Sequence, residues 1–331
     1  MVPAGALSVP DAVVPMPGRW EADREALRFI PLLPFARGVT YALVEGAGTG
    51  SWIELARLER PRVGTAGTAS VVAVHPTAVE VPENLLRLSL TFSAPMDEGS
   101  AAGAVHLVDR AGEEIPYALL PMPPELWDRP RRRLTLLLEP GRIKRGLVPN
   151  AALGAPLEHR TEFALVVDAT IRDAQGAELT AGTRRTYRVG PPVRARVDPT
   201  RWRVSWPTPG SQDALVVRFD RPLDAALTLR CLTVRDEKGQ TVTGRSALAG
   251  GDVEWTFTAD AAWPTGGVEL RVDAALEDLA GNSVRRVFDR DLDEAADAPV
   301  AVDHVILTPA EAHRRLGSEA PPPGSPGPLR A

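Results

Sequence analysis

The sequence predicts an all-β protein of two consecutive antiparallel β-sandwiches followed by one short helix. Three observations predict this class. Short segments in which apolar and polar residues alternate follow one another from residue 70 to residue 290. Turn signals separate them every 8–15 residues or so, the spacing of a sandwich rather than of a strand–helix alternation. The chain of 331 residues also contains 32 Pro and 28 Gly, an excess that disfavours a helical bundle.

The predicted strands fall into an earlier and a later group. The earlier strands are Leu86–Phe92, Ala104–Val108, Arg133–Leu138, Phe163–Val167 and Thr186–Val189. The later strands are Arg201–Trp206, Leu215–Phe219, Cys231–Arg235, Glu254–Thr258, Glu269–Val272 and Ser283–Phe288. In most of them every second residue is apolar, which is typical of a strand with one buried face.

An internal repeat relates the two groups. Phe92-Ser-Ala-Pro-Met-Asp97 matches Phe219-Asp-Arg-Pro-Leu-Asp224 at an offset of 127 residues, and the match continues without a gap into the next strand. Further on, Val167-Asp168 matches Val272-Asp273 at an offset of 105 residues. The first copy therefore carries 22 extra residues in its middle, and we expect two homologous domains.

Four Asp-x-x-Gly segments lie between predicted strands. They are residues 109–112, 173–176, 236–239 and 278–281. An Asp at the first position of a type I turn accepts hydrogen bonds from the backbone that follows, and Gly tolerates a positive φ at the fourth position. Each segment is therefore predicted to close a hairpin. The prolines after the matched Phe strands, Pro95 and Pro222, are predicted to end those strands because proline has no N–H to donate.

The N-terminal part resembles the second half of a further copy. Leu27-Arg-Phe-Ile-Pro31 and Tyr41-Ala-Leu-Val44 follow the pattern of the segments that begin at Trp255 and Glu269. Half a sandwich cannot bury its own sheet. Residues 1–62 are therefore expected to dock on the next domain, to need a docking partner, or to mark a truncated start.

These features divide the chain into six segments. They are a partial repeat at 1–62, a small-residue linker at 63–70, a sandwich with long inserted loops at 71–192, a second sandwich at 193–293, an extension at 294–319 and a disordered Pro-rich tail at 320–331. The extension is predicted to hold the short helix, Pro309–Leu316. Thr308 supplies its N-cap and Glu311 completes a capping box.

Two motifs carry a resemblance to a known family. Phe-Ser-Ala-Pro-Met-Asp, ending at Asp97, and Leu276-Glu-Asp-Leu-Ala-Gly-Asn282 are similar to the opening and closing motifs of bacterial Ig-like domains of the S-layer-protein type. The resemblance covers residues 80–190 and 196–290, and part of 19–46. It implies tandem Ig-like β-sandwiches used as spacers or interaction modules, and it brings no catalytic residues with it. The first copy departs at its ending, Ile171-Arg-Asp-Ala-Gln-Gly-Ala177.

Composition restricts the function classes. The net charge of −5 gives no reason to expect binding to nucleic acid, and no apolar run is long enough to span a membrane. Cys231 stands alone and is predicted to be a core residue. No phosphate-binding glycine loop, nucleophile elbow or paired-histidine motif occurs, so we expect neither a cofactor nor an enzyme. Without a signal peptide the chain as written is expected in the cytoplasm, or at the cell surface if its start is truncated.

One stretch, residues 125–150, is rich in cations and lies largely in the extra length of the first copy. Its candidate binding residues are Trp127, Arg131, Arg132, Arg142, Lys144 and Arg145. Clustered arginines could hold an acidic polymer or the acidic face of a partner, and Trp127 could anchor an interface. The alternative is a solvated loop whose arginines pair with neighbouring acids such as Glu125 and Glu139.

Two further patterns have open alternatives. Asp289, Asp291 and Asp293 supply carboxylates at alternate positions, but without the spacing of a calcium loop they are interpreted as a solvated acidic strand end, and no metal site is predicted. Trp202, Val204 and Trp206 share one face of a strand. Exposed, this stripe could stack sugars; buried, it would seal the junction between domains.

The sequence therefore favours a non-catalytic scaffold or interaction protein whose partner is a protein or a surface polymer. The second hypothesis is a carbohydrate- or polyanion-binding module that uses the arginine-rich 125–150 loop. The third is an enzyme whose site has no recognisable motif.

Overall fold

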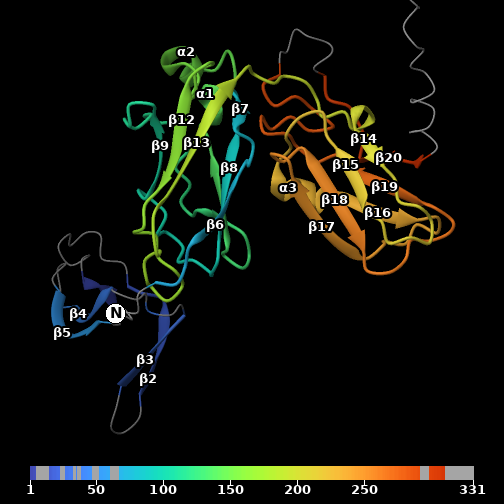
Figure 1. Ribbon diagram of the computed structural model, residues 1–331. Coiled ribbons are helices and arrows are strands. Elements are labelled where there is room, and N and C mark those ends of the chain that lie inside the picture. Colours follow the sequence, from blue (N-terminus) through green and yellow to red (C-terminus); the bar gives the residue numbers. More distant parts are fainter. Residues whose placement is uncertain are drawn as a thin grey trace, which may run out of the picture.

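The computed structural model describes residues 1–4, 15–22, 27–32, 35, 39–46, 52–59, 67–290 and 298–309. Two β-sandwiches stand side by side, and smaller N-terminal sheets lie beyond one end of the first (Figure 1). The predicted all-β class and the Ig-like sandwich architecture are confirmed. The predicted helix Pro309–Leu316 and the tail at 320–331 lie outside the described residues, apart from Pro309.

The first sandwich pairs two four-stranded sheets. One has the order β10-β11-β8-β6 and the other the order β7-β13-β12-β9. The pairs are antiparallel, except that β7 runs parallel to β13. The bounds are β6 Val71–His75, β7 Glu80–Pro82, β8 Arg87–Phe92, β9 Val105–Asp109, β10 Leu126–Trp127, β11 Arg133–Leu137, β12 Glu162–Val167 and β13 Thr183–Gly190.

The second sandwich has a four-stranded sheet, β14-β15-β18-β17, and a three-stranded sheet, β16-β19-β20. A short helix, α3, precedes β16. The bounds are β14 Arg203–Ser205, β15 Leu215–Arg218, α3 Ala225–Cys231, β16 Leu232–Asp236, β17 Gly244–Ala249, β18 Glu254–Ala259, β19 Val268–Asp273 and β20 His304–Leu307, with a 3-10 turn at Pro199–Arg201.

Each sandwich has its own apolar core, built from the alternating strand residues. In β8 the buried residues are Leu88, Leu90 and Phe92, while Arg87 and Ser89 lie on the opposite face. Trp255 on β18 is a central residue of the second core and is 1% exposed. At about 25 cal/mol per Å² of apolar surface, two separate cores give each sandwich its own driving force for folding.

All four Asp-x-x-Gly turns form as predicted. In each turn the glycine N–H donates to the aspartate carbonyl, at 2.8–3.1 Å, and the glycine has a φ of +75° to +89°. The aspartate carboxylate also accepts backbone N–H groups farther along the turn, as Asp278 does from Ala280 and Asn282. These bonds explain why Asp and Gly are needed at the two ends of the turn.

The matched opening and closing motifs meet in both sandwiches. An isolated bridge joins Met96 to Asp173 in the first sandwich, and another joins Leu223 to Asp278 in the second. The next residue of each opening motif adds a backbone hydrogen bond to the closing motif. The Asp97 N–H donates to the Arg172 carbonyl, and the Asp224 N–H donates to the Glu277 carbonyl. In each sandwich the opening and closing motifs are therefore joined to each other by backbone hydrogen bonds.

One predicted strand is wrong. Ser283–Phe288 contains no strand, although Ser283 makes a single bridge to Glu277. The Ser283 hydroxyl accepts the N–H groups of Arg285 and Arg286, and the Asn282 side chain accepts that of Phe288. Local side-chain bonds of this kind compete with a strand ladder. The place beside β19 is taken instead by β20.

The helices also differ from the expectation of a single helix near the C-terminus. The connection from β11 to β12 contains α1, Pro140–Ile143, and α2, Val148–Leu153, and α3 lies in the second sandwich. Glu139 caps α1 by accepting the Gly141 N–H, and Asp224 caps α3 by accepting the Leu227 N–H. No helix among the described residues is long and apolar enough to cross a membrane.

The N-terminal strands form two small sheets, β1-β4-β5 and β2-β3. Their bounds are β1 Val2–Pro3, β2 Gly18–Ala22, β3 Leu27–Pro31, β4 Thr40–Gly46 and β5 Trp52–Glu59. Every residue of β5 is exposed, and Ile53 and Leu55 are each more than half exposed. The assignment of residues 1–62 to a partial repeat that needs a docking partner remains a prediction.

Candidate functional site at the domain junction

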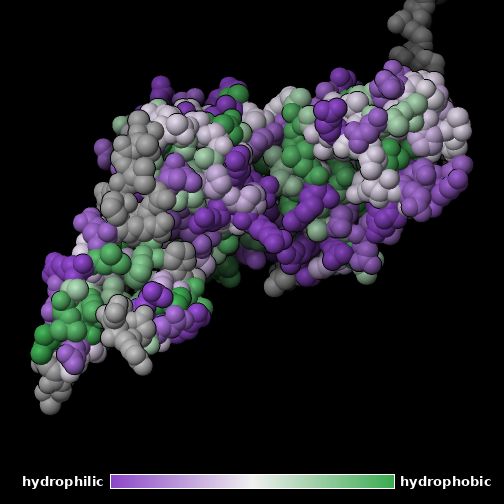
Figure 2. All heavy atoms as spheres, turned by 90° about the horizontal axis from the view of Figure 1, so that it is seen from below, coloured by the Kyte–Doolittle hydropathy of each residue, from purple (hydrophilic) through white to green (hydrophobic). Residues whose placement is uncertain are grey.

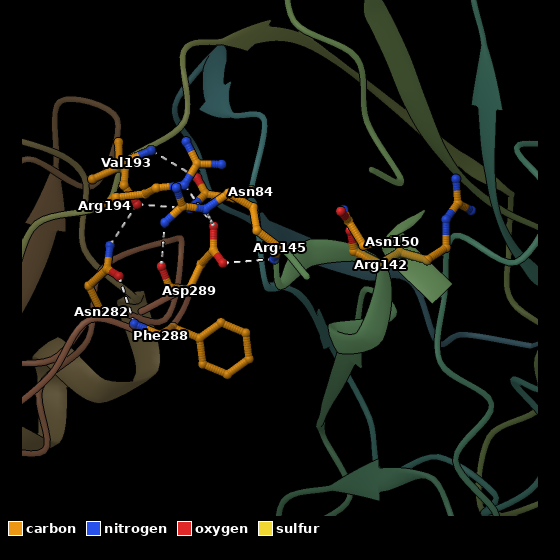
Figure 3. A network of polar contacts seen from close by, with 9 residues as sticks. All are labelled: Asn84, Arg142, Arg145, Asn150, Val193, Arg194, Asn282, Phe288 and Asp289. Atoms are coloured by element: carbon orange, nitrogen blue, oxygen red, sulfur yellow. Dashed lines mark hydrogen bonds and ion pairs between the residues drawn. The ribbon is translucent and has the colours of Figure 1, made fainter. Parts of the chain in front are cut away.

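The segment between the two sandwiches, residues 191–198, is called the junction linker or simply the linker below, and side chains from both sandwiches bind it. Asn84, before β8, exchanges two hydrogen bonds with the backbone of Val193: its amide donates to the carbonyl at 2.8 Å and its oxygen accepts the N–H at 2.9 Å. Asn282, in the second sandwich, donates to the same carbonyl at 2.9 Å. The linker is therefore fixed at its midpoint by two buried asparagines (Figure 3).

Asp289 is the central charge of the junction. Its carboxylate, 1% exposed, accepts hydrogen bonds from Arg194 Nε at 2.7 Å and from Arg145 Nε at 3.0 Å. It also accepts the Arg145 backbone N–H at 2.9 Å. Burial opposes ionisation, but the bonds from Arg194 and Arg145 outweigh it, so the pKa of Asp289 is lowered. One carboxylate thus joins the first sandwich, the linker and the end of the second sandwich (Figure 3).

A second carboxylate, that of Asp252 in the second sandwich, binds residues of the first sandwich. It accepts the N–H and the hydroxyl of Thr77, each at 2.7 Å, and lies 3.3 Å from His75 Nδ1. Burial would raise the pKa of Asp252, yet the bonds from His75 and Thr77 outweigh it, and the pKa is lowered. Residues of β6 and the following loop are thereby tied to the β17–β18 connection.

A third contact joins β8 to α3. Arg87 pairs with Glu277 and lies 3.6 Å from the Asp224 carboxylate. Burial raises the pKa of Glu277 despite the Arg87 charge. Nearby, Asp278 pairs with Arg221, and burial raises its pKa to about 6. These charges are partly or fully buried, so they interact more strongly than surface ion pairs.

The closing motif of the second sandwich also packs on the first. Leu279 belongs to the core of the first sandwich, and its carbonyl accepts the Leu86 N–H at 2.8 Å. A Cβ on Gly281 would meet the Leu86 side chain. In the first copy, Ala174 and Ala177 stand where Leu279 and Asn282 stand in the second. Two of the residues in which the endings differ, Leu279 and Asn282, therefore contact the first sandwich and the linker.

Gly281→Ala is expected to destabilise the protein more than Gly112→Ala. Both glycines have positive φ, so each substitution costs about 1–2 kcal/mol in backbone strain. Only the new methyl group at 281 also strikes Leu86, whereas nothing lies within 4 Å at Gly112, and overpacking of this kind adds roughly 1–3 kcal/mol. Urea unfolding measures both variants. Equal losses would show that the Leu86 contact has no energetic weight.

Arg142, one of the predicted binding residues, is buried and binds the backbone of its own domain. It is 7% exposed and lies in the connection from β11 to β12, residues 138–161, which is called the insertion below. Burial lowers its pKa, with Glu139 acting in the opposite direction. The guanidinium donates at 2.7–3.3 Å to five backbone carbonyls, those of Pro116, Tyr117, Leu153, Gly154 and Ala155.

The other five predicted residues have different surroundings. Lys144 Nζ lies 4.4 Å from the ring centre of Phe288, and Arg145 binds Asp289, so both contact the second sandwich. Trp127 is half-buried, its ring lies tilted against that of Phe92 with the centroids 5.6 Å apart, and its indole N–H donates to Glu125 at 2.7 Å. Arg131 adopts a φ of +54° and Arg132 is exposed.

The six residues were predicted as binding residues, and their surroundings can be compared with the cavities. Three cavities of the described part of the chain have defined linings, and of the six residues only Arg142 belongs to any of these three linings. Three of the six, Arg142, Lys144 and Arg145, contact carbonyl oxygens, an aromatic ring and Asp289 respectively. Polyanion binding by the 125–150 loop remains a prediction.

The structure also shows the surroundings of the tryptophan stripe and of Asp289. Trp202 is buried and meets Phe219 edge-on, and Trp206 packs against the same core. The tryptophan stripe is therefore largely buried, but in the second core rather than at the junction. Asp289, interpreted as a solvated strand end, is buried in the junction; Asp291 and Asp293 lie outside the described residues. No three potential metal ligands gather among the residues that are described.

Comparisons with known proteins give only distant structural matches. No protein-family model matches the chain, and no curated protein matches it by sequence. Domains MG0-NIE-MG1 of Escherichia coli alpha-2-macroglobulin match with 12% identity and a TM-score of 0.26, over 73% of this chain and 72% of that chain. Domains 1–6 of the surface layer protein SbsC match with 14% identity and a TM-score of 0.28, over 73% of this chain and 26% of that chain.

Proposed function

We propose that this chain is a non-catalytic scaffold of tandem Ig-like domains that presents the insertion of its first sandwich to a protein partner. The proposal rests on the five hydrogen bonds from the Arg142 guanidinium to backbone carbonyls, which are called the Arg142 clamp below. By binding both the 116–117 and the 153–155 backbone, one guanidinium fixes the insertion to the loop that follows β9. The insertion is thus held in a defined shape, as a contact surface requires.

The side chains that this clamp presents are apolar. Val148 is 80% exposed and Tyr117 is 76% exposed, and α2 has no buried residue. Leu147 and Leu153 are also exposed. Helices α1 and α2 lie at the end of the first sandwich that is distant from β4 and β5 (Figure 1). Exposed apolar groups on a rigid loop favour contact with an apolar face of another protein.

The insertion is specific to the first sandwich. The connection from β11 to β12 spans residues 138–161, whereas the corresponding connection in the second sandwich, from β18 to β19, spans 260–267. The longer connection holds α1 and α2, and Lys144 and Arg145 tie it to the second sandwich. The resemblance to bacterial Ig-like domains of the S-layer-protein type, which implies spacers or interaction modules, supports the same role.

Site-specific photo-crosslinking tests the proposal. A benzophenone amino acid at Val148, introduced in the organism that makes the protein, is expected to give one discrete cross-linked product. Val72, which is 57% exposed on β6, is the matched control position, and it is expected to give none. Absence of a product at Val148, or the same product at both positions, would contradict the proposed contact surface.

A further inference from the structure

The cleft between the sandwiches contains a cavity beside the junction contact of Arg87 with Asp224. It has a volume of about 400 Å³. One wall is the outer face of β8 and β11, and the other is α3. Its lining residues are Arg87, Ser89, Arg133, Thr135, Asp224, Ala226, Leu227, Leu229 and Arg230. Figure 2, seen from below, shows hydrophilic residues gathered in the region where the two lobes meet.

The strand register explains why polar groups converge on this wall. Thr135 on β11 lies opposite Ser89 on β8, and Arg133 lies opposite Thr91. Arg87, Ser89, Arg133 and Thr135 therefore project from the same face, away from the core leucines. Two hydroxyls stand between two guanidinium groups on one surface.

Two donors on this wall lack acceptors. The Nε atoms of Arg87 and Arg133 are buried without a hydrogen-bond partner. Among the residues that the structure describes, no acceptor binds the Arg133 guanidinium. A buried donor without an acceptor costs about 1–3 kcal/mol, and more when the group is charged. Two such donors lining one cavity point to an acceptor that enters from outside the chain.

The charged side chains around the cavity indicate that this acceptor carries a negative charge. The three guanidinium groups of Arg87, Arg133 and Arg230 are opposed by two carboxylates, Asp224 and Glu277, both of which pair with Arg87. Arg133 is left with positive charge facing the cavity, and Arg230 lies on the opposite wall. Arginine binds phosphate and carboxylate groups through paired N–H donors.

The second sandwich lacks this arrangement. At the positions that match Arg87, Ser89 and Arg133 it has Ala214, Val216 and Glu254. The fold therefore does not require an arginine at the positions of Arg87 and Arg133. The second sandwich keeps a threonine, Thr256, at the Thr135 position and has Arg218 at the Thr91 position. The pair Arg87 and Arg133 is therefore the part of this face that the first sandwich alone has, and it lies opposite α3.

We propose that the cleft between β8–β11 and α3 binds a small organic anion through Arg133, with Ser89 and Thr135 as hydrogen-bonding partners and Arg230 on the facing wall. The anionic group is a phosphate or a carboxylate. Leu227 and Leu229 of α3 line the same cavity, so a short apolar body accompanies the anionic group. Binding brings the two sandwiches together on one ligand, and it does not depend on the partner proposed for the insertion.

Calorimetric titration of the whole chain tests the proposal with four probes: inorganic phosphate, phenyl phosphate, benzoate and the neutral benzamide. Phenyl phosphate or benzoate is expected to bind at a single site and more tightly than inorganic phosphate, and the tighter of the two identifies the anionic group. Binding of neither anion, or equally tight binding of benzamide, would overturn the proposal.

Two variants locate the site. Arg133→Gln is expected to weaken binding about tenfold or more, since a charge-assisted hydrogen bond is lost. Arg203→Gln removes an exposed arginine from the outer face of the second sandwich and is expected to leave binding unchanged. If Arg133→Gln does not fold, Ser89→Ala with Thr135→Val gives the same test. Equal weakening by Arg203→Gln would overturn the assignment.

Discussion

Asp289→Asn is expected to separate the unfolding of the two sandwiches. The wild-type carboxylate binds Arg145 and Arg194, and the amide leaves both guanidinium groups without their counter-charge. Because these arginines are partly exposed, water recovers some of the loss, and we expect a destabilisation of about 2 kcal/mol. The two cores themselves are not changed. Urea unfolding followed by tryptophan fluorescence should then show two transitions where the wild type shows one.

The control for this variant is Asp303→Asn. Asp303 pairs with Arg285 at 2.9 Å, but its side chain is 90% exposed. Exposed pairs of this kind contribute about 0–1 kcal/mol. The control should therefore keep a single transition near the wild-type midpoint. If both variants behave alike, the buried position of Asp289 has no special effect and the junction is weaker than the contacts indicate.

Arg142→Met is expected to cause the largest loss of stability. Methionine fills much of the same volume, but it cannot donate to the five carbonyls that Arg142 binds. Buried carbonyls without donors destabilise the fold, and we expect a loss of about 3–5 kcal/mol together with loosening of the insertion. Hydrogen exchange measured by mass spectrometry should show faster exchange over residues 140–157.

Arg132→Met is the matched control for this change. Arg132 is exposed, and among the residues described no acceptor binds its guanidinium. Its replacement should change stability by less than about 0.5 kcal/mol. Equal effects of the two substitutions, or unchanged exchange over the insertion in Arg142→Met, would show that the clamp does not hold the insertion.

Local features of the fold could be predicted from the sequence. The turn at 109–112 and its three counterparts need only an Asp carboxylate and a Gly with positive φ, so the residues alone identify them. The alternation in Arg87–Phe92 likewise shows which face is buried. Ser283–Phe288 has a strand-like pattern, but side-chain bonds from Asn282 and Ser283 prevent a ladder there.

The junction could not be predicted in this way. Asp289 binds residues 95 and 144 positions away, and no local pattern connects them. Arg142 stands in a cation-rich stretch that resembles a binding loop, yet its partners are backbone carbonyls, which every residue has. One signal was present in the sequence: the second closing motif has Leu279 and Asn282 where the first has Ala174 and Ala177. That difference marks the copy whose end contacts a neighbouring domain.

The contacts of Asp289 and Asp252 across the junction are expected to hold the two sandwiches as one rigid unit. A distance distribution between spin labels at Glu113 and Lys238 tests it most directly, because both side chains are exposed at equivalent turns of the two sandwiches. The buried Cys231 is replaced by alanine in all samples. We predict one narrow distribution for this protein and a broad one after Asp289→Asn. A broad distribution before that substitution would contradict this expectation.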